Sequence, residues 1–180
     1  FNKKITSILM TELDKKNNAI LSRKFKNNKK VSIEKKKIFK IKKKFDVVLY
    51  LHVLEHIKND NLEIKEAIKK LKKNAYLIFL VPAHNKMYSN LDKLVGHYRR
   101  YELNFFKKKF NTVHQCDLKF LDSMGYILYF LNKIFFKKEA HPSKLKIFIW
   151  DKFFTPITVI VDFFSRYRFG KCILAVYKKY

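Results

Sequence analysis

Glycine, proline and cysteine are scarce in this sequence, which has only 3 glycines, 3 prolines and 2 cysteines in 180 residues. The glycines Gly96, Gly125 and Gly170 are isolated, so they cannot together form a glycine-rich loop. Two cysteines, Cys116 and Cys172, are too few for a disulfide framework in a chain of this length, and they lack metal-ligand spacing. We therefore expect a reducing compartment, with no disulfide framework and no metal.

Acidic residues are also few: 15 aspartates and glutamates stand against 41 lysines and arginines, a formal net charge of +26. Such an excess suits nucleic acid, because clustered lysines neutralise phosphates. Here the lysines are spread along the chain among many asparagines, isoleucines and phenylalanines, which indicates a compositional bias. Zinc-finger spacing, an aromatic RNA-binding signature and a confined basic arm are all missing, so the sequence disfavours nucleic acid as a partner.

The apolar stretch 145–164 is about as long as the roughly 20 residues that a membrane-spanning helix needs. Asp151, Lys152 and Asp162 argue against spanning, and Pro156 would kink the helix. A packed or interfacial amphipathic helix is the better interpretation. We expect a cytoplasmic protein and leave peripheral membrane contact open. Because the chain begins with Phe1 rather than methionine and its first residues already have a strand pattern, we also expect an upstream segment to be missing. No signal peptide is visible, although a truncated start could hide one.

Apolar runs alternate with helical patterns along the chain. "FDVVLYL" has the continuous β-branched run of a strand buried on both faces, and Asp60 with Glu63 can cap the helix that follows. We predict an α/β fold with a mostly parallel sheet in one domain over 1–180, and a long helical stretch over 123–167. The predicted strands are 5–10, 31–34, 46–51, 75–81, 112–119 and 171–177.

Three polar segments follow predicted strands at their carboxyl ends. They are "TELD" at 11–14, "LHVLEHI" at 51–57 and "PAHNKMYSNLD" at 82–92. The carboxyl ends of parallel strands are where α/β sheets bind their ligands. A fourth segment, "LVGHYRRY" at 94–101, gathers glycine, histidine, arginines and tyrosines beyond the third of these ends.

These motifs carry a family resemblance. "FDVVLYLHVLEHIKND", "VPAHNKMYSNLDKLVGHYRRY" and a final "RFGKCILAVYKK" resemble the bacterial class I S-adenosylmethionine-dependent methyltransferases over nearly the whole chain. The resemblance implies a Rossmann-like sheet with helices on both faces, an antiparallel last strand and a helical insertion before it. It also implies that the first strand and glycine-rich loop of the family precede Phe1, so that the domain is N-terminally incomplete.

The resemblance further implies cofactor contacts for S-adenosylmethionine. Glu12 matches the acidic residue that accepts hydrogen bonds from both ribose hydroxyls, with Asp14 as the alternative acid. Lys37 stands where the family usually has an acid for the adenine amino group, and lysine cannot accept that hydrogen bond. The candidate cofactor-binding residues are Glu12, Leu13, Lys37, Ile38, Leu51 and His52.

Methyl transfer mainly requires alignment of a nucleophile with the sulfonium, and a general base helps a hydroxyl acceptor. The titratable residues near the strand ends are the catalytic candidates Glu55, His56, His84 and His97. A structural hydrogen-bonding role is an equal alternative for each of them.

The segment 94–101 is expected to cover the cofactor pocket and face the acceptor. Arg99 and Arg100 could hold a carboxylate or phosphate, and the candidate acceptor-binding residues are Tyr88, Tyr98, Arg99 and Arg100. The alternative is an arginine pair that ties this loop to acidic neighbours such as Asp92 or Glu102, and we expect one of the two arginines to have that structural role.

Three classes of function remain. Methyl transfer to a small-molecule, lipid-linked or glycan-linked acceptor, with an anionic acceptor left open, is the leading hypothesis. A non-catalytic or truncated remnant is second, because Lys37 replaces an acid and "KKNA" stands where the family usually has a glycine pair. A basic binder of nucleic acid or membrane surfaces is third and depends on charge alone.

Overall fold

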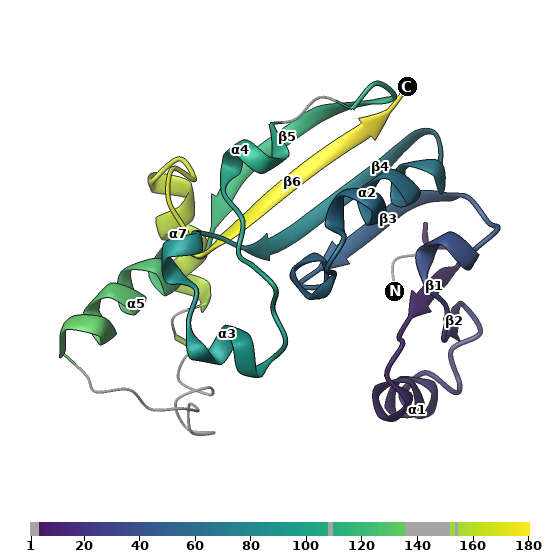
Figure 1. Ribbon diagram of the computed structural model, residues 1–180, viewed down its shortest axis with the longest axis horizontal. Helices are drawn as coiled ribbons and strands as arrows, with labels where there is room; N and C mark the ends of the chain where they lie inside the picture. The colour runs from purple at the N-terminus through teal and green to yellow at the C-terminus, as the bar shows by residue number, and fades with distance from the viewer. Residues whose placement is uncertain (1–3, 108–109, 136–151, 154) are drawn as a thin grey trace. The chain divides into compact units, whose positions relative to one another are not determined.

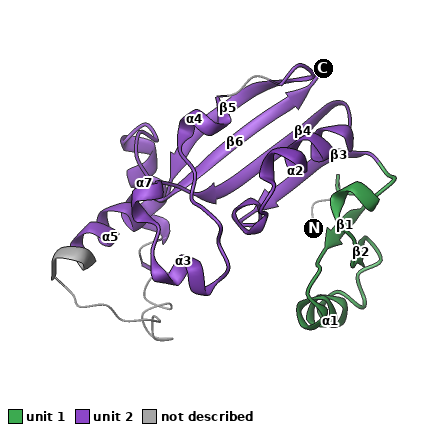
Figure 2. Ribbon diagram, viewed as in Figure 1, with its two compact units in different colours: residues 1–43 green, residues 44–180 purple. Residues whose placement is uncertain are grey.

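The computed structural model describes residues 4–107, 110–135, 152–153 and 155–180. The chain divides into two compact units, residues 1–43 and residues 44–180, which Figure 2 colours separately. The expectation of one domain over the whole chain stays a prediction. The predicted helical stretch over 123–167 lies partly outside the described residues.

Unit 1 is a small α/β unit whose two strands are parallel. Strand β1 (Ile8–Thr11) pairs with β2 (Val31–Glu34), and Ile8 lies opposite Val31. Helix α1 (Lys15–Lys24) connects them, and a short turn of 3₁₀ helix, η1, covers Ile38–Lys40. The sequence predicted both strands, although the first was expected to begin three residues earlier.

Unit 2 contains a four-stranded sheet of order β3-β4-β6-β5. Strand β3 pairs in parallel with β4, whereas β6 pairs antiparallel with both β4 and β5. Only β6 therefore runs against the other three strands, as expected for the last strand. The strands are β3 (Phe45–Leu51), β4 (Leu71–Pro82), β5 (Val113–Leu121) and β6 (Cys172–Lys179).

Helices and helical turns connect these strands and complete the predicted α/β class. They are η2 (Leu54–His56), α2 (Asp60–Lys69), η3 (Asn85–Met87), α3 (Asn90–Leu94), α4 (Leu103–Phe106), α5 (Ser123–Phe135) and α7 (Thr155–Phe164).

One face of the four-stranded sheet carries the hydrophobic core of unit 2. Strand β4 alternates along its length, so Leu77, Phe79 and Val81 are fully buried on this face. Ile64 of α2 and Phe106 of α4 belong to the same buried cluster, and both helices lie over this face in Figure 1. Burial of such side chains contributes about 1.5–3 kcal/mol each, which anchors the strands whose ends form the site.

The expectation that "FDVVLYL" is buried on both faces is wrong for the described sheet. Strand β3 lies at the edge, and Val47, Leu49 and Leu51 are 46%, 56% and 53% exposed. An apolar run identifies a strand with apolar side chains on both faces, but it does not say whether anything covers each face. The core side of β3 is represented by Tyr50, which is buried and stacks on Phe79.

The start of α2 also differs from the prediction. Asn59 caps the helix, because its side chain accepts a hydrogen bond from the backbone N–H of Leu62 at 3.2 Å. Asp60 is the first helical residue, and its carboxylate pairs with Arg99 instead. Glu63 accepts a hydrogen bond from the Tyr50 hydroxyl at 2.9 Å, so the acid expected to complete a capping box fixes the helix to β3.

Helices α5 and α7 meet at a buried aspartate. Asp162 of α7 is 4% exposed and accepts hydrogen bonds from the backbone N–H groups of Asp122 and Ser123 at 3.0 and 2.8 Å. Before β6, Gly170 packs so tightly that an added Cβ would lie 2.2 Å from the carbonyl oxygen of Leu121. Among the described residues, no helix combines the length and apolar character needed to cross a membrane.

Candidate active site

The backbone turns sharply where β3 and β4 end. His52 and His84 have φ values of 52° and 65°, a left-handed conformation that side chains other than glycine rarely adopt. The backbone N–H of His52 still pairs with Leu80 at 2.8 Å, so the turn begins at a fixed point of the sheet. Strained backbone of this kind concentrates at functional sites, where the surrounding structure holds it in place.

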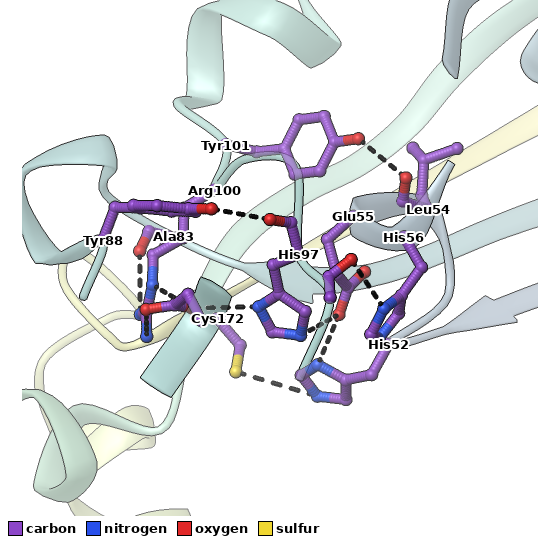
Figure 3. A network of polar contacts seen from close by, with 12 residues as sticks. His52, Leu54, Glu55, His56, Ala83, Tyr88, His97, Arg100, Tyr101 and Cys172 are labelled. Carbon is purple, nitrogen blue, oxygen red and sulfur yellow. Dashed lines mark hydrogen bonds and ion pairs between the residues drawn. The ribbon is translucent and has the colours of Figure 1, made fainter. Parts of the chain in front are cut away.

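The turn directs Glu55 into the protein, where its side chain is fully buried. Neither carboxylate oxygen has a hydrogen-bond partner among the described residues. The nearest polar groups are two imidazoles: His52 Nδ1 lies 3.4 Å and His97 Nε2 lies 4.0 Å from Oε1. Figure 3 shows both rings turned towards this carboxylate. A buried carboxylate without a positive partner destabilises the fold, so the charge of these rings decides how well Glu55 is stabilised.

His52 contacts a thiol as well as Glu55, since its Nε2 lies 4.0 Å from Cys172 Sγ. Interaction with the Cys172 sulfur and with the Glu55 carboxylate raises the pKa of the His52 imidazole to about 10, although its partial burial opposes the shift. The ring is therefore an imidazolium at neutral pH and supplies positive charge on one side of the carboxylate.

The segment 94–101 supplies His97 to this cluster. Gly96 permits the turn with φ of 83°, and the backbone N–H of Tyr98 donates to the carbonyl oxygen of Glu55 at 2.8 Å. The Tyr88 hydroxyl donates to the carbonyl oxygen of His97 at 2.6 Å. His56 packs edge-on against His97, with ring centroids 4.6 Å apart. Two predicted site segments are thus brought together around Glu55.

Both arginines of this segment form ion pairs with buried aspartates. Arg100 pairs with Asp92 through Nε at 2.9 Å and a second nitrogen at 3.1 Å, and its side chain is only 11% exposed. Arg99 pairs with Asp60, and its second terminal nitrogen donates to the Lys58 carbonyl at 2.8 Å. The ion pair between Arg100 and Asp92 agrees with the alternative prediction, in which an arginine ties this loop to an acidic neighbour. The Arg99 side chain remains 32% exposed.

Asp92 is the central acid of this network. It is 2% exposed and accepts hydrogen bonds from Arg100, from the Ser89 backbone N–H at 2.8 Å and from His97 Nδ1 at 2.9 Å. Burial would raise the pKa of Asp92, but the hydrogen bonds from Arg100, His97 and Ser89 outweigh it and hold this pKa below its ordinary value. Sequence reasoning named Asp92 only as an alternative partner, although Ser89-x-x-Asp92 has the spacing of a capping box.

His84, the remaining catalytic candidate, has other neighbours. Its Nε2 lies 2.9 Å from the carbonyl oxygen of Gly170, and its ring stacks on Phe120 with centroids 5.0 Å apart. Glu102 is 3.9 Å from its Nδ1. These contacts place His84 outside the cluster around Glu55, so the structure brings together three of the four catalytic candidates.

The cofactor candidates of unit 1 lie around the end of β1. Glu12 follows the strand and accepts a hydrogen bond from the backbone N–H of Asp14 at 2.8 Å. Asp14, the alternative acid, caps α1 by accepting from the Asn17 N–H at 2.8 Å. A hollow of about 260 Å³ is lined by Leu13, Lys35, Lys36, Lys37, Phe39 and Lys40. Ile38 begins η1 beside these residues.

In unit 2, the cofactor candidates Leu51 and His52 are both exposed at the end of β3. Tyr98, an acceptor candidate, is 54% exposed, whereas the Tyr88 hydroxyl is engaged by His97. The functional role of each of these residues stays a prediction.

Comparison with known proteins agrees with this architecture. Residues 2–79 match the family model described as a methyltransferase domain. No curated protein matches the chain significantly. Enzymes of this family use S-adenosylmethionine as the methyl donor.

Solved structures share the fold of this chain at low identity. N-methyltransferase NodS from Bradyrhizobium japonicum, in complex with S-adenosylhomocysteine, is 11% identical with a TM-score of 0.57, over 96% of this chain and 66% of its own. Coclaurine N-methyltransferase, bound to N-methylheliamine and S-adenosylhomocysteine, is 13% identical with a TM-score of 0.59. The match covers 95% of this chain and 60% of that enzyme's chain. YcgJ from Bacillus subtilis is 11% identical with a TM-score of 0.59, and the match covers 97% of this chain and 82% of the YcgJ chain.

Proposed function

We propose that the protein transfers a methyl group from S-adenosylmethionine to an acceptor held beside Glu55, His56 and His97. The observation that carries this proposal is the meeting of His97, from the segment 94–101, with the fully buried Glu55 at the end of β3. The carboxyl ends of strands are where α/β folds assemble their sites. The methyltransferase family of residues 2–79 supplies the reaction type.

The residues of unit 1 suit the ribose and adenine of the cofactor. A carboxylate such as Glu12 can accept hydrogen bonds from both ribose hydroxyls. Leu13 and Phe39 give apolar surface to the adjoining hollow, where a flat base could pack, and the other lining residues are lysines. Bound S-adenosylmethionine supplies an activated methyl group, and the protein has to align it with the nucleophile.

We further propose that the acceptor carries negative charge. The net charge of +26 favours an anionic partner, and Arg99 retains an exposed part beside the site. Arg100 is the less suitable residue, because two of its guanidinium nitrogens bind the buried Asp92, the third donates to the Ala83 carbonyl oxygen, and its side chain is only 11% exposed. Peripheral membrane contact and a lipid-linked or glycan-linked acceptor stay predictions.

The test uses the protein in its natural full length. Calorimetric titration should show one S-adenosylmethionine bound per chain, and radiolabelled methyl groups should pass to members of a panel of anionic hydroxyl and amine compounds. Arg99→Lys keeps the charge but loses the planar fork, so the KM for the acceptor should rise while cofactor affinity stays unchanged.

The other outcomes separate the remaining function classes. Cofactor binding without turnover of any acceptor would favour a non-catalytic remnant. Binding of DNA or anionic vesicles that weakens steeply with salt, together with no cofactor binding, would favour a basic binder and overturn the proposal.

A further inference from the structure

The negative charge of the buried Glu55 carboxylate is only partly compensated by the residues that face it. Its carboxylate is fully buried, and neither oxygen accepts a hydrogen bond among the described residues. The His52 imidazole lies 3.4 Å from Oε1, too long and too exposed a contact to satisfy both oxygens. The His52 imidazolium faces Oε1 from the exposed side, so it compensates the buried charge only in part, and a second cation close to the carboxylate would stabilise it further.

The two neighbouring histidines are oriented as metal ligands usually are. His97 Nδ1 lies 2.9 Å from the carboxylate of Asp92, which leaves Nε2 directed at Glu55. His56 Nδ1 lies 3.2 Å from the carbonyl oxygen of Gly96, so the other ring nitrogen, Nε2, is the one available to bind a metal ion. Metal-binding histidines commonly donate their second ring N–H to a carboxylate or a backbone carbonyl, which fixes the tautomer and the ring.

We propose that Glu55, His56 and His97 bind one divalent transition metal ion. One ligand atom from each residue lies within 4.8 Å of the others. Atoms bonded to one zinc ion at about 2.1 Å lie at most about 4.2 Å apart, so a small rotation of the exposed His56 closes the site. This site was not expected from the sequence, because the candidate ligands are not spaced as in a zinc finger.

The ligand set indicates the class of metal. Two imidazoles and one carboxylate suit zinc and neighbouring first-row ions, whereas magnesium and calcium require mostly oxygen ligands. Three protein ligands leave at least one position open, as in catalytic zinc sites. In the proposed methyl transfer, that position would hold an oxygen of the acceptor; this last step rests on the proposed function, whereas binding of the ion does not.

The experiment measures metal binding directly. The natural full-length protein, without a polyhistidine tag, is stripped with a chelator and titrated with Zn²⁺ by calorimetry, and with Co²⁺ by visible absorption. We expect one ion per chain, a Co²⁺ spectrum with nitrogen ligands, and a rise in Tm on zinc addition. Glu55→Gln and His97→Gln should each weaken binding at least about 10-fold, because each removes a ligand.

His114→Gln is the matched control, because His114 is exposed, packs on Tyr180 and lies outside the cluster. This variant should bind zinc as the unaltered protein does. Circular dichroism of the metal-free variants checks that they fold. If the unaltered protein binds no ion, or if Glu55→Gln and His97→Gln bind it normally, the proposal is wrong and the His52 imidazolium alone faces the Glu55 carboxylate.

Metal binding and methyl transfer can fail separately. Zinc binding that depends on Glu55 supports the metal site even if no S-adenosylmethionine binds. Conversely, turnover by a chelator-treated protein that binds no zinc would support methyl transfer and overturn the metal site.

Discussion

The end of β1 and the end of β3 both present acidic residues, but they differ in burial. Glu12 and Asp14 lie near the surface, and each accepts a hydrogen bond from a nearby backbone N–H. Glu55 is fully buried, and the residues that face it come from the separate segment 94–101 as well as from its own turn. The first end therefore has acids that need no distant partner, whereas the second depends on long-range packing.

Because of this difference in burial, substitutions at the end of β3 should mainly change stability, whereas substitutions at the end of β1 should mainly change binding. Changes at the buried end disturb a network whose members hold one another, so losses should exceed those of single exposed contacts. Changes at the exposed end should leave the fold intact and affect only what binds there.

The largest expected effect is that of Asp92→Ala on stability. This change leaves the buried Arg100 guanidinium without its carboxylate and removes the hydrogen bonds of Ser89 and His97. Breaking a buried ion pair in this way costs about 3–5 kcal/mol, measured as the free energy of unfolding in urea. A loss below about 1 kcal/mol would show that the network at the end of β3 is not cooperative.

The same aspartate predicts a pH dependence. Because its folded pKa is lowered, the stabilisation by Asp92 is fully present above its unfolded pKa and is lost as pH falls through the folded pKa. The unaltered protein should therefore lose stability between neutral and strongly acidic pH more steeply than Asp92→Asn. Parallel unfolding curves for the two proteins at each pH would contradict this assignment.

The second effect in size is expected at the exposed end. Glu12→Gln should weaken S-adenosylmethionine binding by about 1.5–3 kcal/mol, the range for hydrogen bonds to a charged group. Calorimetric titration measures it, and the urea midpoint should stay unchanged. Unchanged cofactor affinity would remove Glu12 from the ribose site.

A smaller effect is expected from Tyr88→Phe. Loss of the hydroxyl that donates to the His97 carbonyl should cost about 0.5–1.5 kcal/mol of stability. The KM for the acceptor should change little, because the Tyr88 hydroxyl is expected to stabilise the loop and not to bind the acceptor. An unchanged stability with a raised KM would instead assign Tyr88 to the acceptor, as the sequence resemblance implied.

The smallest effect is expected from Asp14→Asn. Asparagine caps helices about as well as aspartate does, so stability should change by less than about 0.5 kcal/mol. Cofactor affinity should also be unaffected, which makes this variant the control for Glu12→Gln. Weaker binding by Asp14→Asn alone would assign the ribose to Asp14.

Local patterns in the sequence were sufficient to predict the main strands. The apolar run ending at Leu51 and that ending at Pro82 were identified because β-branched and aromatic residues favour strands. The antiparallel last strand came from the family resemblance and not from periodicity. The edge position of β3 was missed, because pairing depends on partners that a single segment does not reveal.

The site was only partly predictable for the same reason. Glu55, His56 and His97 were identified from their place near predicted strand ends, but neither the burial of Glu55 nor its facing histidines follows from local sequence. Asp60 is a residue type that commonly caps helices, yet its carboxylate accepts a hydrogen bond from Arg99, 39 residues later in the chain. The link between Asp162 and Ser123, also 39 residues apart, has no local signal either.

In the proposed methyl transfer, the buried cluster at the end of β3 serves the chemical step. Glu55→Gln keeps the shape of the side chain and removes its charge, so it should leave S-adenosylmethionine affinity unchanged and lower turnover at least about 100-fold. Both quantities are measured on the same preparation, by calorimetry and by radiolabelled methyl transfer. Turnover equal to that of the unaltered protein, with the fold intact, would contradict the account.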